Sequence, residues 1–363
     1  MGFNCGIVGL PNVGKSTLFN ALLATQAAEA ANYPFCTIEP NVGRVAVPDE
    51  RLDKLAKIAG SAQIIPTQLE FVDIAGIVRG ASKGEGLGNQ FLSHIREVDA
   101  IIYMLRCFDD GDITHVEGRI SPLDDAEIIE TELVLADMES LEKRLPALQK
   151  KAKGDKDAKE QVEIMEKLLK AVSEGKPART VVPANDVERR IIRNMQLLTA
   201  KPVLYVCNVE EASAATGNHY SKAVMEKVDA PVVVISAKIE SEVAQLPSEE
   251  DKREFLEALG LKETGLAQLI RAGYSLLNMI TFFTIGPKEA RAWTVARGSF
   301  APQAAGVIHT DFEKGFIRSE TIACNDYISL NGEQGAKEAG KLRLEGKEYV
   351  VQDGDVLHFR FNV

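Results

Sequence analysis

The residues best placed to do chemistry form a glycine-rich segment near the N-terminus, Gly9-Leu10-Pro11-Asn12-Val13-Gly14-Lys15-Ser16. The segment matches the pattern GxxxxGK[ST], follows a short apolar run and precedes apolar residues at helical spacing. In such a loop the backbone N–H groups surround phosphate oxygens, and the start of the helix adds positive potential. Lys15 is predicted to contact the β- and γ-phosphates, and Ser16 to ligate Mg²⁺. The sequence therefore predicts a nucleotide phosphate site rather than an empty glycine-rich turn.

A second element, Asp73-Ile74-Ala75-Gly76, ends the apolar run 68–72. It matches the DxxG element of small GTPases, in which the Asp holds Mg²⁺ through water and the Gly N–H contacts the γ-phosphate. An ordinary turn at the end of a strand is the alternative. Thr37 lies between the two elements and is a further Mg²⁺ candidate by position. We expect Ser16, Thr37 and Asp73 to serve the metal, and Lys15 and Gly76 to act in catalysis.

Hydrolysis is expected to be slow, because Ile77 occupies the position where small GTPases carry the Gln that orients the attacking water. Five glycines within residues 76–88 predict a loop that reorganises with the γ-phosphate. His115 is a candidate catalytic group, with a surface or packing role as the favoured alternative. Asn12 is a candidate ligand for a monovalent cation such as K⁺, unless it only shapes the loop.

The segment at the position of the base-recognition motif differs from the motif that binds guanine in small GTPases. Small GTPases carry Asn-Lys-x-Asp at this point, and its Asp accepts two hydrogen bonds from guanine. Here the run 201–207 leads into Asn208-Val209-Glu210-Glu211, which places Val209 at the Lys position and the longer Glu211 at the Asp position. Because each unmade polar contact costs about 1–3 kcal/mol, we expect weak guanine preference and favour ATP. Ser236-Ala237-Lys238 is predicted to complete the base-binding loops.

The elements that position these residues alternate between short apolar runs and helical or polar stretches. This alternation is typical of an α/β fold, a parallel sheet wrapped by helices. The predicted strands cover residues 3–8, 68–72, 100–106, 201–208 and 231–236.

The long segment 108–200 is too long for one crossover helix. Two apolar stripes at heptad-like spacing, 134–148 and 162–172, flank the turn Gly154–Asp155 and predict an antiparallel helical hairpin. Pro146 is expected to kink or interrupt the first helix, and a third helix is expected over 186–199. We interpret this region as a helical domain inserted in the α/β domain.

Charge separates the insert from the rest of the chain. Residues 137–200 hold 14 lysine and arginine residues against 11 acidic ones, whereas the whole chain has a net charge of −11. A solvated coiled-coil face explains such a mixture most simply. After residue 278 short strands separated by Gly and Asp turns predict a small mixed domain; they cover 281–285, 293–295, 321–323 and 356–361, with a turn at 352–355.

Length and composition limit the class of protein. The 363 residues fit two or three domains, and 45% hydrophobic with 26% charged residues is ordinary globular composition. Apolar runs fall far short of the roughly 20 residues of a membrane span. Five scattered cysteines without a CxxC pair favour reduced thiols and a cytoplasmic protein without a membrane partner. The five histidines show no zinc spacing, and no Ser-His-Asp grouping supports a protease.

Long motifs resemble those of the YchF family, the Obg-like ATPase branch of the translation-factor-related P-loop proteins. They are the glycine-rich segment 9–16, Asn-Tyr-Pro-Phe-Cys-Thr-Ile-Glu-Pro-Asn at 32–41, the segment 71–91, and in the C-terminal region residues 291–294, 301–306 and 309–318. The resemblance runs the whole chain. It implies an OBG-type G domain (1–280), an inserted helical coiled-coil domain (125–200) and a C-terminal TGS domain of the β-grasp type (281–363). It also implies ATP hydrolysis and binding to the ribosome or its large subunit.

The resemblance also assigns residues by position. A hydrophobic residue in place of the Gln marks this family and matches Ile77. The implied phosphate and base contacts are Asn12, Val13, Gly14, Lys15, Ser16, Thr17, Asn208, Val209, Ser236, Ala237 and Lys238. Glu211 is a further candidate base contact from its place in the base-recognition element.

The leading hypothesis is therefore an ATP-hydrolysing switch protein of the translation machinery, dependent on Mg²⁺. The net-basic insert beside the TGS domain predicts RNA contacts. One alternative is a true GTPase in which Glu211 reaches guanine, and another is a nucleotide-gated ribosome- or RNA-binding protein with negligible turnover. The candidate RNA contacts are Lys143, Arg144, Lys150, Lys151 and Lys153.

Overall fold

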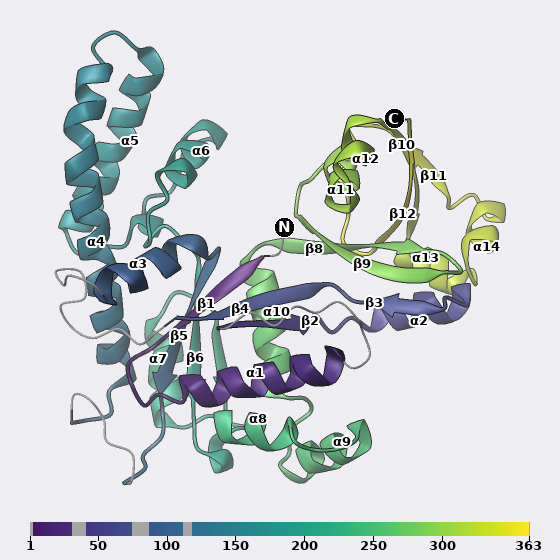
Figure 1. Cartoon of the computed structure of the whole chain (residues 1–363), viewed down its shortest axis with the longest axis horizontal. Helices are drawn as coiled ribbons and strands as arrows, with labels where there is room; N and C mark the ends of the chain where they lie inside the picture. The colour runs from purple at the N-terminus through teal and green to yellow at the C-terminus, as the bar shows by residue number, and fades with distance from the viewer. Residues whose placement is uncertain (1–2, 31–40, 75–86, 112–117, 363) are drawn as a thin grey trace. The chain divides into compact units, whose positions relative to one another are not determined.

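The computed structural model describes residues 3–30, 41–74, 87–111 and 118–362 (Figure 1). The chain forms two compact units. The large unit contains residues 3–44 and 70–273, and the small unit contains residues 45–69 together with the chain from 274 onward.

The large unit is built on a six-stranded sheet in the order β2-β4-β1-β5-β6-β7. Parallel pairing joins β4 to β1, β1 to β5, β5 to β6 and β6 to β7, as the apolar runs predict. Every residue of β5 and β6 is buried, because helices cover both faces of a parallel sheet. The strands are β1 (Asn4–Val8), β2 (Val42–Ala46), β4 (Gln68–Asp73), β5 (Ala100–Arg106), β6 (Val203–Asn208) and β7 (Val232–Ile235).

The helices of the large unit follow its strands in the chain. They are α1 (Lys15–Ala30), α3 (Leu87–Glu97), α4 (Pro122–Lys151), α5 (Lys156–Ser173), α6 (Asp186–Met195), α7 (His219–Lys227), α8 (Ala237–Val243), α9 (Glu249–Ala258) and α10 (Gly265–Leu276), with short 3-10 turns η1 (Ala178–Thr180) and η2 (Glu211–Ser213).

Helices α4 and α5 form the predicted hairpin and lie side by side (Figure 1). Asp155 starts α5 by accepting hydrogen bonds from the N–H groups of residues 157 and 158. Leu141 packs with Ile164 and Leu168 in one apolar cluster between the helices. Of the two effects expected of Pro146, the interruption is wrong, since α4 continues through it to Lys151, whereas the kink stays a prediction. The apolar stripe on both sides of the proline packs against α5 and offsets the lost backbone hydrogen bond.

The third helix, α6, ends earlier than the predicted limit at residue 199. Its C-cap Gln196 takes a left-handed conformation with φ of 52°, which stops the helix after Met195. The following residues fold back onto α4. There Asp137 accepts hydrogen bonds from Leu198 N–H (2.8 Å), Thr199 N–H (2.8 Å) and the Thr199 hydroxyl (2.6 Å). The hairpin is thereby anchored to the segment that enters β6.

The small unit contains a mixed six-stranded sheet in the order β11-β10-β12-β8-β9-β3. Its strands are β3 (Gln63–Ile65), β8 (Met279–Ile285), β9 (Glu289–Ala296), β10 (Phe316–Ala323), β11 (Arg343–Glu345) and β12 (Asp355–Phe361), and its helices are α2 (Glu50–Ala59), α11 (Ala301–Ile308), α12 (Thr310–Lys314), α13 (Cys324–Ser329) and α14 (Glu333–Glu338).

The early segment 45–69 belongs to this small unit, which the sequence analysis did not predict. Strand β3 pairs in parallel with β9, and Leu52 and Leu55 of α2 pack in one cluster with Phe283 of β8. The predicted C-terminal strands lie within β8, β9, β10 and β12. None of the helices among the described residues is long and apolar enough to cross a membrane.

Candidate functional site

The glycine-rich segment forms the loop between β1 and α1, and α1 begins at Lys15. Asn12 and Gly14 have positive φ angles of 64° and 92°. A Cβ atom on Gly14 would lie 2.3 Å from Nδ2 of Asn208, and one on Gly9 would lie 2.7 Å from the carbonyl oxygen of Met104. Two of the motif glycines are therefore required by close packing, and Gly14 also by its backbone conformation.

Lys15 and Asp73 form an ion pair, and their side chains are only 12% and 20% exposed. The pairing follows from the sheet, because β1 lies beside β4 and Ile7 is in register with Asp73. The predicted phosphate-binding lysine and the predicted metal-binding carboxylate thus meet at one edge of the sheet.

Asn208, at the end of β6, connects three loops of the site. Its Nδ2 donates to the carbonyl oxygen of Val13 at 2.9 Å, and its Oδ1 accepts from the N–H of Ala237 at 2.9 Å. Its own carbonyl oxygen accepts from the N–H of Cys107 at 2.8 Å. The side chain is buried, so these bonds are shielded from water.

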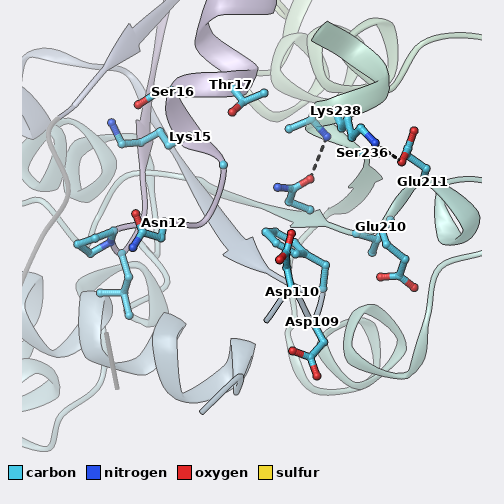
Figure 2. Close-up of a pocket in the computed structure, with 17 residues that line it drawn as sticks. Asn12, Lys15, Ser16, Thr17, Asp109, Asp110, Glu210, Glu211, Ser236 and Lys238 are labelled. Carbon is cyan, nitrogen blue, oxygen red and sulfur yellow. Dashed lines mark hydrogen bonds and ion pairs between the residues drawn. The ribbon is translucent and has the colours of Figure 1, made fainter. Parts of the chain in front are cut away.

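These loops surround a cavity of about 780 Å³, within the range of small-molecule sites (Figure 2). All of the predicted phosphate and base contacts line it except Val13, which is buried and supplies its carbonyl oxygen to Asn208. The lining residues are Leu10, Pro11, Asn12, Gly14, Lys15, Ser16, Thr17, Phe108, Asp109, Asp110, Asn208, Val209, Glu210, Glu211, Ser236, Ala237 and Lys238.

Part of this wall, Phe108, Asp109 and Asp110, was missed by the sequence analysis. The signal that would have found it is its position directly after β5, between two strands whose ends carry predicted site residues. Phe108 offers an apolar ring to the cavity, and the guanidinium of Arg106 lies 4.8 Å from its centroid. Figure 2 shows Asp109 and Asp110 on the same side of the cavity as Glu210.

Glu211 points toward Lys238, and the two side chains form an ion pair with 2.7 Å between Oε2 and Nζ (Figure 2). The hydrogen bond to Glu211 raises the pKa of Lys238. Neighbouring Glu210 instead turns to α7, where its Oε2 accepts from Nδ2 of Asn218 at 3.0 Å. Both carboxylates that follow β6 are therefore engaged by protein donors.

The donor set fits a magnesium ion bound together with phosphate. In nucleotide sites Mg²⁺ takes one or two protein oxygens, phosphate oxygens and water. The exposed hydroxyl of Ser16, in the first turn of α1, and the carboxylate of Asp73 are such oxygens. Among the described residues no cluster of three or more His, Cys, Asp or Glu side chains forms a metal site of another kind.

Other predicted residues lie outside the described residues. These are Thr37 for the metal, Gly76 and His115 for catalysis, and Ile77. Of the five cysteines, the four within the described residues are free thiols.

Two family models match this chain. Residues 4–138 match "50S ribosome-binding GTPase", and residues 279–362 match the C-terminal YchF-GTPase model described as a protein of unknown function. Two curated relatives named "Ribosome-binding ATPase YchF" match over the full length of both chains, with 59% identity in Haemophilus influenzae and 57% in Bacillus subtilis. The chain belongs to the YchF family.

A solved structure of this family agrees with the fold. The Schizosaccharomyces pombe "YchF GTPase" is 40% identical, superposes with a TM-score of 0.88, and covers 99% of this chain and 98% of its own. The predicted fold class and the predicted YchF resemblance are confirmed. YchF proteins are named both as ATPases and as a GTPase, so the family by itself does not decide between ATP and GTP.

Proposed function

We propose that this YchF-family chain is a ribosome-associated P-loop ATPase that hydrolyses ATP to ADP and phosphate and acts as a nucleotide-dependent switch in or near translation. The curated relatives carry this activity and this partner in their names. The observation that carries the choice of ATP is the base-binding end of the cavity, where Glu211 is paired with Lys238.

Guanine recognition needs a carboxylate that accepts two hydrogen bonds from the base. Glu211 has an extra methylene compared with the usual Asp, and its Oε2 is occupied by Lys238. To bind guanine, Glu211 would have to give up its ion pair with Lys238. Adenine does not need this carboxylate as an acceptor, so the ion pair can stay in place. Weak GTP hydrolysis is compatible with this arrangement, and a GTPase in which Glu211 leaves Lys238 is the second candidate.

The chain's own residues bind and orient the nucleotide. Backbone N–H groups of the loop 9–16 and the ammonium of Lys15 hold the phosphates. Ser16 and Thr37 are proposed to ligate Mg²⁺, and Asp73 to hold it through water; the ion, when bound, would neutralise phosphate charge. Gly76 and His115 remain proposed catalytic groups. With Ile77 at the position of the usual Gln, we expect slow turnover unless a partner supplies a catalytic group.

A potassium site at Asn12 also remains a proposal. The left-handed backbone of Asn12 supports the alternative that the residue shapes the loop, since Asn tolerates this conformation better than most residues.

Ribosomal RNA is proposed to contact the helical insert. Three of the five candidate cations already have intramolecular partners: Lys143 pairs with Glu139, Lys151 lies 3.5 Å from Asp155, and Arg144 donates to the carbonyl oxygen of Met195 at 2.9 Å. In the described part of the chain Lys150 and Lys153 have no ion pair, so they are the favoured phosphate contacts. The C-terminal TGS region, the domain boundaries 1–280, 125–200 and 281–363, and a cytoplasmic location belong to the same proposal.

Calorimetry on nucleotide-free protein tests the base preference, with ATP and GTP titrated side by side in the presence of Mg²⁺. We expect ATP to bind at least tenfold more tightly, about 1.4 kcal/mol. A clear preference for GTP would establish the GTPase alternative instead. Single-turnover hydrolysis of ATP with and without ribosomes then tests the switch, because negligible turnover in both conditions would leave only a nucleotide-gated binding protein.

A further inference from the structure

A second cavity, of about 770 Å³, lies in the large unit at the amino-terminal ends of β5 and β6. The nucleotide cavity lies at the carboxyl ends of the same strands, so the two cavities are separate. The second cavity is lined by residues 96–99 at the end of α3, by residues between 178 and 183 around η1, by α6, and by residues 196–202 before β6. Segments that are far apart in the sequence therefore line one cavity.

The charge of this wall is opposite to that of the whole chain. Five cationic side chains line it against two acidic ones, although the chain carries a net charge of −11. The acidic pair is Glu97 and Asp99, and Asp99 already accepts a hydrogen bond from the N–H of Asn4 at 3.1 Å. The cations are Arg96, Arg179, Arg189, Arg193 and Lys201.

Three of these cations have partners within the fold. Arg179 donates to Glu130 at 2.8 Å, and exposed Arg189 pairs with Asp186 on its own helix. Lys201 donates to the backbone carbonyl oxygens of Arg96 (2.9 Å) and Val98. These contacts hold the cavity wall in place, but they leave little donor capacity for a ligand.

Arg96 and Arg193 differ from the other three. Within the described residues no hydrogen bond or ion pair engages either guanidinium group, and both side chains are exposed to solvent. The carboxylate of Asp137 acts on Arg96 through its charge alone, because its oxygens accept hydrogen bonds from Leu198 and Thr199. Two arginines from different helices thus face one cavity with their donors available.

We propose that this cavity binds a small molecule that carries phosphate groups, with Arg96 and Arg193 as its phosphate ligands. The planar fork of a guanidinium matches phosphate oxygens better than a lysine ammonium does. The volume is close to that of the first cavity and lies within the range of small-molecule sites. Val98, Ile192 and Pro202 supply apolar wall for the uncharged part of the ligand.

Calorimetric titration with inorganic pyrophosphate tests this second site independently of nucleotide hydrolysis. The wild-type chain is expected to bind pyrophosphate at two sites, and Lys15→Ala is expected to weaken only the one in the glycine-rich loop. In the Lys15→Ala background, Arg96→Gln with Arg193→Gln should weaken the remaining binding at least tenfold. Pyrophosphate affinity at this second site should also fall as salt is added, because the attraction to the arginines is electrostatic.

The matched control is Arg190→Gln with Lys222→Gln, two exposed cations of the same unit that do not line the cavity. Equal weakening by the control pair, or no saturable binding to Lys15→Ala, overturns the proposal. It is also overturned if the arginine pair weakens binding of a single-stranded RNA but leaves pyrophosphate binding unchanged, since the face would then be an RNA contact. Arg193→Gln alone provides a second variant should the double substitution lower the melting temperature.

Discussion

Nδ2 of Asn208 lies 2.9 Å from the carbonyl oxygen of Val13, although 195 positions separate the two residues in the chain. The bond ties the end of β6 to the phosphate-binding loop. The loop proposed to bind the base is tied to the same side chain through the N–H of Ala237. One buried amide therefore sets the distance between the phosphate end and the base end of the cavity.

Replacing Asn208 by Ala should weaken nucleotide binding and destabilise the fold together. The change leaves the Val13 carbonyl and the Ala237 N–H without their partner, at about 1–3 kcal/mol for each group. Calorimetric ATP affinity and denaturant unfolding measure the two effects. Asn208→Asp separates the two bonds, because it keeps the acceptor for Ala237 but sets a buried carboxylate oxygen against the Val13 carbonyl, so it should also weaken binding. Wild-type affinity in both variants would contradict this role.

Gly14→Ala should abolish nucleotide binding while leaving the rest of the large unit folded. The added methyl would lie 2.3 Å from Nδ2 of Asn208, and φ of 92° is unfavourable for Ala. Calorimetry with ATP and a circular dichroism melt follow the two properties. Gly111→Ala is a suitable control, since its added Cβ meets no atom of the described residues within 4 Å and its φ is not in the left-handed range. Tight ATP binding by Gly14→Ala would show that the loop accommodates a side chain.

Glu211→Asp should shift preference toward GTP. The shorter side chain loses its 2.7 Å contact with Lys238 and restores the residue type that reads guanine in small GTPases. We expect the ratio of GTP to ATP affinity to rise about tenfold, which corresponds to one gained hydrogen bond of about 1.4 kcal/mol. Glu210→Asp serves as the control, because Glu210 is held by Asn218. An unchanged ratio would mean that position 211 does not read the base.

Glu240 should make stability depend on pH. Burial raises the pKa of this carboxyl to about 6, although hydrogen bonds from the N–H groups of Gly265 and Leu266 oppose the shift. Because the folded pKa lies above its ordinary value of 4.5, the protonated group contributes stability below pH 4.5, and this contribution disappears as the pH rises through 6. The free energy of unfolding should therefore fall by about 2 kcal/mol over this interval relative to Glu240→Gln.

Urea unfolding at several pH values between 4 and 7 measures this difference. The absolute stability of Glu240→Gln is expected to be lower, since its amide supplies only one acceptor for the two N–H groups. The two proteins are compared by the slope of the free energy of unfolding against pH. Parallel curves for the two proteins would show that Glu240 does not titrate in this range.

The amino-acid sequence by itself determined the elements whose signals are local. The glycine-rich loop, the buried strands and the helical hairpin were predicted because each depends on residues close together in the chain: Gly14 beside Lys15, the apolar run of β5, and Asp155 as the cap of α5. Parallel strands with such loops also place their carboxyl ends at one edge, which was enough to assemble most of the candidate site.

Only the tertiary structure decided the contacts between distant segments. The wall at Phe108, the pairing of Glu211 with Lys238 and the bond from Asn208 to Val13 depend on strand order and side-chain direction. The same holds for the pairing of β3 with β9 and for Pro146, which α4 tolerates because its neighbours pack against α5. Local sequence favours a helix or a strand, but packing between residues far apart in the chain determines where that element ends and which residues it contacts.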